Sequence, residues 1–191
     1  MQVLKEEIRN SILLSAKMLF LEYGYLSTSM DKIAKKAGIS KSNLYNYFEK
    51  KEDIFEILTK NTVYRFIEIK NYFVRTDFDL GTNLELFVNE FINKTGEFIL
   101  NDREIILLLI DSSSGTKYER MVDDMIDIFA KKFARRMKNN NYPELIAKVL
   151  ATSLIQGIVS IIKFSNTKQE IIENLSALFI YHTNGIKTLI V

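Results

Sequence analysis

The sequence predicts an all-α protein, and three observations lead to this prediction. One proline and seven glycines stand among 191 residues, so few positions interrupt a helix. Apolar residues recur mostly at steps of three and four, which places them on one face of a helix. Serine, threonine and glycine stand where helices of that spacing would begin and end. The run Ile105–Ile110 alone would suit a buried strand, but no neighbouring segment offers a second strand, and a helix is preferred.

The helices are predicted over residues 5–23, 28–37, 41–48 and 52–73 and, after a loop at 76–82, over residues 83–100, 103–112, 116–138, 143–164 and 168–189. Gly24 is expected to end the first helix, and Thr28 to cap the second by accepting hydrogen bonds from its first turn. Gly38 stops the second helix, because glycine takes a left-handed conformation without penalty, and Ser40 caps the third. We expect two domains, a headpiece over residues 5–65 and a body over residues 66–191.

Composition limits the class of protein. The chain has no cysteine, which excludes a disulfide framework and thiolate metal sites. Its start lacks the apolar run of a secretion signal, so a cytoplasmic location is expected. The longest uncharged apolar stretch, Val149–Ile162, has 14 residues, fewer than the roughly 18 to 20 that a membrane span needs. No membrane partner is therefore expected.

Positive charge is concentrated near the amino end. Between Thr28 and Lys51 there are six lysines and two acidic residues, a net charge of +4, whereas the whole chain carries +2. The remainder is therefore slightly acidic. A concentrated positive potential is what a surface that binds phosphates requires.

The segment from Thr28 to Phe48 indicates two short helices that meet at a tight turn, a probe for the DNA major groove. Leu44 and Phe48 are expected to face inward, onto the preceding helix. The side chains left outside, whose types can hydrogen-bond base edges, are Lys41, Ser42, Asn43 and Asn46. The side chains placed to reach backbone phosphates are Tyr45, Tyr47, Thr28, Ser29, Lys32 and Lys51. The alternative is a small three-helix subdomain whose lysines are merely solvated.

The same part of the chain carries a family resemblance. The matching stretches are Ile12–Phe20, Gly24-Tyr25, Thr28-Ser29, Ile33-Ala34, Ala37–Ser40, Leu44-Tyr45, Tyr47-Phe48 and Lys51–Ile54. In identity and spacing, they resemble the tetracycline-repressor (TetR/AcrR) family of bacterial transcriptional regulators. The resemblance covers roughly the first third of the chain. Tyr47 stands where the family often has histidine and Ser42 where glycine is frequent, so the base preference stays open.

The resemblance implies a TetR-like fold, in which a helix-turn-helix headpiece precedes a helical body for ligand binding and dimerisation. It implies a repressor that binds a double-stranded DNA operator and leaves it when a small molecule binds the body. Matched by position, the phosphate contacts are Tyr45, Tyr47, Lys51, Thr28 and Ser29, and the base-reading residues are Lys41, Ser42, Asn43 and Asn46. The main alternative is a helical protein-interaction factor that retains the headpiece.

The last fifty residues have too many apolar positions for one helix face, which predicts a homodimer. The protein core would cover one stripe and a symmetry mate the other, as in a four-helix interface. The predicted interface residues are Leu154, Ile158, Ile161, Leu175, Leu178, Phe179, His182 and Ile186. The alternative is a compact monomer that buries both stripes. Two-fold symmetry predicts a palindromic operator.

A ligand pocket is predicted among aromatic and methionine side chains of the body. They are Phe87, Phe91, Phe98, Tyr118, Met121, Met125 and Phe129, and few charges fall among them, so an apolar or aromatic effector is expected. The same spacing is also typical of plain core.

Other chemistry finds little support in the residues. His182 is the only histidine, and without cysteines it cannot build a typical transition-metal site, so a structural role is expected. Asp123 and Asp127 could hold a hard cation, but a solvated face paired to Lys131 is preferred. The sequence has no Gly-x-Ser-x-Gly elbow and no glycine-rich phosphate loop. We expect neither an enzyme nor a bound cofactor or metal.

Overall fold

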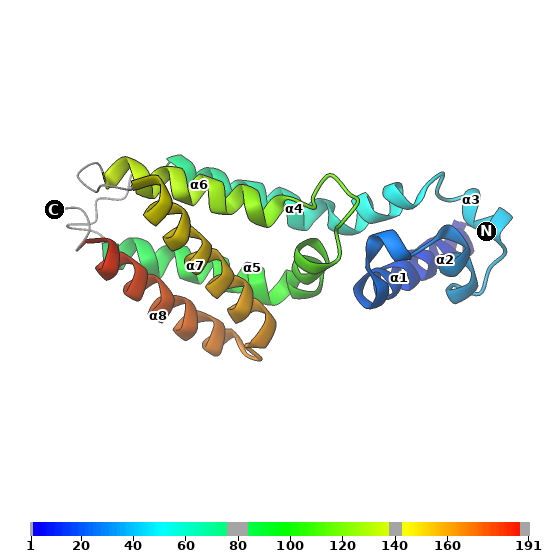
Figure 1. The fold of residues 1–191 in the computed structure, drawn as a ribbon. Coiled ribbons are helices and arrows are strands. Elements are labelled where there is room, and N and C mark those ends of the chain that lie inside the picture. Colours follow the sequence, from blue (N-terminus) through cyan, green and yellow to red (C-terminus); the bar gives the residue numbers. More distant parts are fainter. Residues whose placement is uncertain (1, 76–83, 138–142, 188–191) are drawn as a thin grey trace. The chain divides into compact units, whose positions relative to one another are not determined.

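The computed structural model describes residues 2–75, 84–137 and 143–187. Within these ranges, the side chains at positions 2, 3, 73, 136 and 187 and at most positions from 84 to 94 are not described. All regular secondary structure within these ranges is α-helical, which confirms the predicted fold class (Figure 1). The helices are α1 (Gln2–Ser27), α2 (Met30–Lys36), α3 (Lys41–Tyr45), α4 (Lys51–Arg75), α5 (Leu84–Asp111), α6 (Met121–Arg136), α7 (Pro143–Phe164) and α8 (Lys168–Lys187).

Two predicted boundaries in the middle of the chain are wrong. The helices expected at 83–100 and 103–112 form one continuous helix, α5. The polar residues at 102 and 103 do not interrupt the helix, because their side chains have partners in the fold. Asp102 accepts a hydrogen bond from Arg65 at 2.5 Å, and Arg103 donates one to the Lys163 carbonyl at 2.6 Å. Helix α6 begins at Met121 and not at residue 116, since the preceding residues form turns closed by hydrogen bonds to Ser113 and Thr116.

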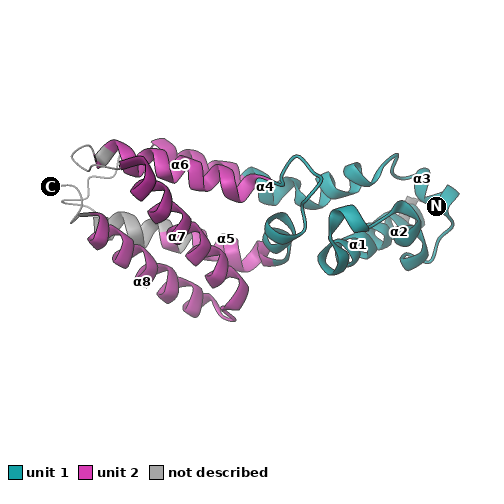
Figure 2. Cartoon of the chain, viewed as in Figure 1, with its two compact units in different colours: residues 1–64, 104–119 teal, residues 65–103, 120–191 magenta. Residues whose placement is uncertain are grey.

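The chain divides into two compact units (Figure 2). The first comprises residues 1–64 together with 104–119, and the second comprises residues 65–103 and 120–191. Both α4 and α5 therefore contribute to each unit. The sequence did not indicate that residues 104–119 would join the amino-terminal helices. The functional division at residue 65 stays a prediction.

The first unit is built on a closely packed apolar core. Its fully buried members come from α1, α2, α3 and α4, and they include Ile12, Ala16, Phe20, Ile33, Leu44, Ile54 and Phe55. Gly24 interrupts α1 with a φ of 77° and a ψ of 164°, a conformation that is essentially restricted to glycine. The predicted end of the first helix is thus a kink at Gly24, after which one further turn leads to α2.

The second unit is a helical bundle in which α7 packs against both α6 and α8. At Gly157 of α7 a Cβ would lie 2.9 Å from the Leu178 side chain of α8, so the absence of a side chain lets these two helices approach closely. On the other side, Lys148 of α7 forms an ion pair with Asp127 of α6. This pair replaces the predicted partner, Lys131. Burial of one side of α7 between these two neighbours accounts for part of its largely apolar sequence.

By length and composition, α7 is the one helix among the described residues that would suffice to cross a membrane, with a mean hydropathy of 2.0 over its most apolar 18 residues. A third of that window, 33%, is buried within the protein. A core helix of a globular bundle satisfies the same criterion. The expectation of no membrane partner therefore stays a prediction.

Candidate nucleic-acid interface

Helices α2 and α3 are each started by a serine cap. Ser29 accepts a hydrogen bond from the Lys32 N–H at 3.3 Å, and Ser40 accepts one from the Asn43 N–H at 3.2 Å. The sequence predicted Thr28 as the cap of α2, but the cap is Ser29. Between the helices, Gly38 has a φ of 71°, in the left-handed region that favours glycine. Caps and turn together fix the two short helices at an angle set by local sequence.

The inward face of this helix pair is apolar, as predicted. Leu44 is fully buried, Phe48 is 4% exposed, and Ile33 of α2 is also fully buried. The Arg9 guanidinium of α1 lies over the Phe48 ring, 5.6 Å from its centroid. Because these contacts lie on one side of α3, the opposite side is left to the solvent.

The outward face of α3 carries the predicted base-reading side chains. Lys41, Ser42, Tyr45 and Asn46 are exposed, whereas Asn43 and Tyr47 are half-buried. Helix α3 ends at Tyr45 and Asn46 is its C-cap, so the helix is shorter than predicted. Ser42 lies 3.1 Å from the Ser40 hydroxyl oxygen, within hydrogen-bonding distance. The structure thus brings a lysine, a serine, two asparagines and two tyrosines together around one short helix.

Thr28 occupies a different place from the one predicted. Its side chain is 2% exposed, and its hydroxyl donates to the carbonyls of Leu19 at 3.2 Å and Gly24 at 2.9 Å. The hydroxyl therefore ties α1 to the start of α2 and is turned away from solvent. Of the adjacent pair in the sequence, Ser29 is the exposed member.

Lys51 lies at the first residue of α4 and holds the same junction from the other side. Its ammonium donates to the carbonyls of Tyr25 at 2.5 Å and Thr28 at 2.7 Å, and lies 4.0 Å from the Tyr25 ring centroid. Burial lowers the pKa of Lys51 from its usual value. Two of its three N–H groups are thus used inside the protein, which leaves one for a phosphate.

Lys32 and Lys41 also have partners within the headpiece. Lys32 donates to the Ser27 carbonyl at 2.8 Å and lies over the Tyr23 ring. Lys41 pairs with Asp31 of α2 at 2.7 Å, and this hydrogen bond raises the pKa of Lys41. Both lysines remain exposed, so a phosphate or a base could still reach them.

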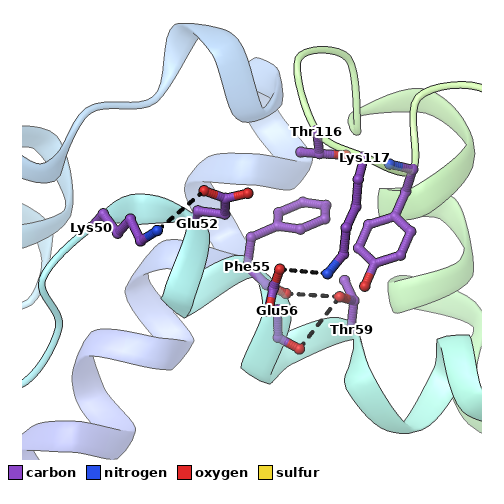
Figure 3. Close-up of polar contacts among 8 residues, drawn as sticks. Lys50, Glu52, Phe55, Glu56, Thr59, Thr116 and Lys117 are labelled. Atoms are coloured by element: carbon purple, nitrogen blue, oxygen red, sulfur yellow. Dashed lines mark hydrogen bonds and ion pairs between the residues drawn. The ribbon is translucent and has the colours of Figure 1, made fainter.

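Residues 104–119 complete the first unit and were not predicted to do so. The Tyr25 N–H donates to the Ser112 carbonyl at 2.9 Å, and Lys17 of α1 pairs with Glu104 at 2.6 Å. Figure 3 shows Lys117 reaching Glu56 of α4 beside the ring of Phe55, and this ion pair measures 2.6 Å. These contacts join residues that are far apart in the chain, so only the folded structure reveals them.

The predicted ligand residues divide between the two units. Tyr118 belongs to the first unit, where its ring stacks on Phe55 with centroids 6.3 Å apart. Phe98 and Phe129 are buried in the second unit, whereas Met121 and Met125 are half-buried there. The side chains of Phe87 and Phe91 lie outside the described residues. The structure therefore does not bring the whole predicted set to one place.

A groove in the second unit has a volume of about 410 Å³. Its lining residues come from α4 and α5 and are Arg65, Glu68, Ile69, Tyr72, Thr95, Glu97 and Phe98. Of the predicted ligand residues whose side chains the structure describes, Phe98 lies in this lining. The Arg65 guanidinium lies 5.2 Å from the Phe98 ring centroid and pairs with Asp102, so this wall combines an aromatic ring with a charge.

Most of the predicted dimer residues are already buried within one chain. Leu154, Leu175, Phe179, His182 and Ile186 are each at most 5% exposed, and Ile158, Ile161 and Leu178 are half-buried. The first five have almost no surface left for a partner, because α7 and α8 bury them against their neighbours. His182 fills a structural position, with one ring nitrogen 3.0 Å from the Leu178 carbonyl and the other 3.3 Å from the Ser153 hydroxyl.

Helices α2 and α3, joined at Gly38 and held by a buried core with polar tips outward, define a helix-turn-helix protein. Residues 12–58 match the family described as bacterial regulatory proteins, tetR family. This match supports the TetR family for the amino-terminal part of the chain.

The similar proteins are named as transcriptional regulators. The chain is 27% identical over 113 residues to the HTH-type transcriptional activator FasR of Mycolicibacterium smegmatis, covering 59% of this chain and 50% of that one. It is 29% identical over 104 residues to the HTH-type transcriptional repressor BepR of Brucella suis, covering 54% and 49%. The chain thus spans about half the length of these relatives. A solved TetR-like transcriptional regulator from Rhodococcus sp. RHA1 has the same fold, with a TM-score of 0.61, 19% identity and coverage of 93% and 96%.

Proposed function

We propose that this protein is a cytoplasmic, DNA-binding transcriptional repressor that binds a palindromic operator as a homodimer and is released by a small-molecule effector. The observation that carries the proposal is the two-sided character of α3. Leu44 and Phe48 anchor it in the core, while Lys41, Ser42 and Asn46 stay exposed. An anchored helix with exposed polar side chains is what reading the major groove requires.

The surroundings of α3 suit the phosphates on either side of a major groove. Lys35 and Lys36 are exposed in the last turn of α2. Tyr45 is 46% exposed and offers a hydroxyl on a rigid ring. Contacts of this kind position a protein on the duplex without reading its sequence. We assign the base contacts to Lys41, Ser42, Asn43 and Asn46.

Dimerisation is proposed through α7 and α8, by a surface that differs from the predicted one. The exposed apolar side chains on these helices are Leu145, Val149, Phe164, Ile180 and Tyr181. Leu145 is 63% and Tyr181 73% exposed. Large apolar side chains on two adjacent helices favour burial against a second copy. Two headpieces related by two-fold symmetry would bind half-sites one or more helical turns, about 34 to 36 Å each, apart.

An apolar or aromatic effector in the second unit is proposed on the lining of the groove between α4 and α5. Ile69, Tyr72 and Phe98 offer apolar surface there, and the charged members of the lining are Arg65, Glu68 and Glu97. One similar protein is named an activator and another a repressor. We propose repression because effector release of an operator needs no contact with the transcription machinery.

A salt titration of DNA binding tests the proposal. The wild-type protein should select one palindrome from a pool of randomised duplexes and bind it more tightly than random DNA. A dimer that contacts about six to ten phosphates should lose roughly a thousandfold or more in affinity between about 50 and 200 mM salt, because each contact releases a counterion.

The opposite outcome is equally clear. If neither the selected pool nor random duplex is retained at low salt, DNA binding is wrong and a helical protein-interaction factor becomes the better account. If DNA is bound without preference for a palindrome, the dimeric arrangement is wrong while the nucleic-acid surface stands.

A further inference from the structure

We propose that Asp31 is a specificity-determining residue: its carboxylate neutralises the reading helix and so lowers the affinity for DNA of arbitrary sequence. The inference rests on the proposed function, because it concerns the same DNA-reading surface. It adds a residue that contributes by repelling phosphates, whereas the residues assigned above contribute by attraction.

The argument begins with the charge of α3. From Gly38 to Phe48, Lys41 is the only charged residue in the sequence. Its Nζ lies 2.7 Å from Oδ1 of Asp31, which stands in the first turn of α2. Both side chains are well exposed, at 57% and 64%. The whole charge of the reading helix is therefore compensated by one carboxylate from the preceding helix.

The Asp31–Lys41 ion pair is expected to contribute little to the stability of the fold. Ion pairs between exposed side chains contribute little to stability, since solvent screens the attraction and both side chains lose conformational freedom. Asp31 also benefits from the positive end of α2, but that benefit does not need Lys41. The pair does lie in the surface proposed to face DNA, where its electrostatic effect is largest.

Beside a duplex, the Asp31 carboxylate affects the contact of Lys41 with a phosphate and its contact with a base to different extents. A phosphate that takes Lys41 must displace Asp31 and leave two anions near each other, so the gain from that contact is reduced. A guanine edge presents neutral acceptors, O6 and N7, and Lys41 keeps two N–H groups for them while the third stays with Asp31. Asp31 therefore penalises attachment to the backbone more than contact with a base.

The chain offers a matched control in the same unit. Glu52 stands in the first turn of α4, is 49% exposed, and pairs with exposed Lys50 at 3.7 Å. Glu52→Gln thus removes an exposed, paired acid from a first helical turn, as Asp31→Asn does. The difference is that Lys50 precedes α4, whereas Lys41 belongs to the reading helix.

The experiment measures affinity for two probes as a function of salt. One probe is a random duplex of about 30 base pairs, roughly three helical turns; the other is the palindrome that the wild-type protein selects. Asp31→Asn should raise affinity for the random duplex by about three- to tenfold near 0.1 M salt and steepen the salt dependence by up to about 0.9 for each bound headpiece, the value of one phosphate contact. The gain on the palindrome should be smaller, so the ratio between the probes should fall.

Two further variants secure the assignment. Lys41→Gln should remove the effect, so that Asp31→Asn adds nothing in the Lys41→Gln background. Glu52→Gln should change the random-duplex affinity by less than Asp31→Asn. Thermal melting of each variant confirms that it is folded.

The inference is overturned if Asp31→Asn and Glu52→Gln have the same effect, or if the effect persists without Lys41, because general charge would then explain it. It is also overturned if both probes gain equally. Failure of the wild-type protein to bind either probe is a different result, since it would remove the proposed function itself.

Discussion

Replacing Phe55 with alanine is expected to lower the free energy of unfolding of the first unit by about 3 to 5 kcal/mol, the range for a fully buried aromatic side chain. Phe55 is 1% exposed and its ring meets those of Phe20 at 5.4 Å, Tyr25 at 5.1 Å and Tyr118 at 6.3 Å. It therefore joins α1, α4 and the segment 104–119. Losing it would leave a cavity at the point where these elements meet.

Chemical denaturation followed by circular dichroism measures this effect. Tyr64→Ala is the control, because Tyr64 is an aromatic residue of the same helix and is 63% exposed. We expect the control to change stability by no more than about 0.5 kcal/mol. Equal effects of the two substitutions would show that the ring cluster does not hold the first unit together. Operator affinity should fall with Phe55→Ala, since α3 rests on the same core.

Replacing Lys51 with methionine is expected to affect both stability and DNA binding. Methionine keeps an unbranched stem beside Tyr25 but leaves the carbonyls of Tyr25 and Thr28 without their donor. These carbonyls are only partly buried, so water offsets some of the loss, and about 1 to 3 kcal/mol is expected. The remaining N–H of Lys51 is assigned to a phosphate, so the salt slope of operator binding should fall by about 0.9 per half-site, or about 1.8 for the dimer.

The two effects of Lys51→Met can be separated. Lys35→Met, which removes an exposed lysine from the last turn of α2, should leave the stability within about 0.5 kcal/mol of wild type. If Lys51→Met lowers stability but leaves the slope of operator binding unchanged, Lys51 positions the junction and touches no phosphate. If the slope falls while stability is retained, its bonds to the two carbonyls contribute little to folding.

Local features of the fold could be predicted from the sequence because they depend on neighbouring residues. The spacing of Leu44 and Phe48 identified the inward face of α3, and Ser40 and Gly38 were correctly assigned as cap and turn. The choice between Thr28 and Ser29 could not be made in this way. Either can cap a helix, and what decides is that Thr28 is buried against α1.

Features that depend on distant contacts were not predictable. The ring of Tyr118 was expected in a ligand pocket, but it stacks on Phe55 of the first unit. The apolar stripe of α8 that was assigned to a dimer contains Leu175 and Phe179, which the same chain buries. Periodicity shows that a face must be covered, but it does not show which helix covers it. The Asp31–Lys41 pair likewise emerges only when α2 and α3 are folded together.

The central claim is that the outward side chains of α3 and its C-cap meet nucleobases, and base selection by Asn43→Ala and Asn46→Ala variants tests it most directly. Each variant and the wild-type protein would select duplexes from the same randomised pool. The account predicts that each substitution relaxes the preference at one position of each half-site, at a cost of about 1 to 3 kcal/mol for the base that asparagine contacted, and leaves the other positions unchanged. An unchanged preference at every position in both variants would contradict it.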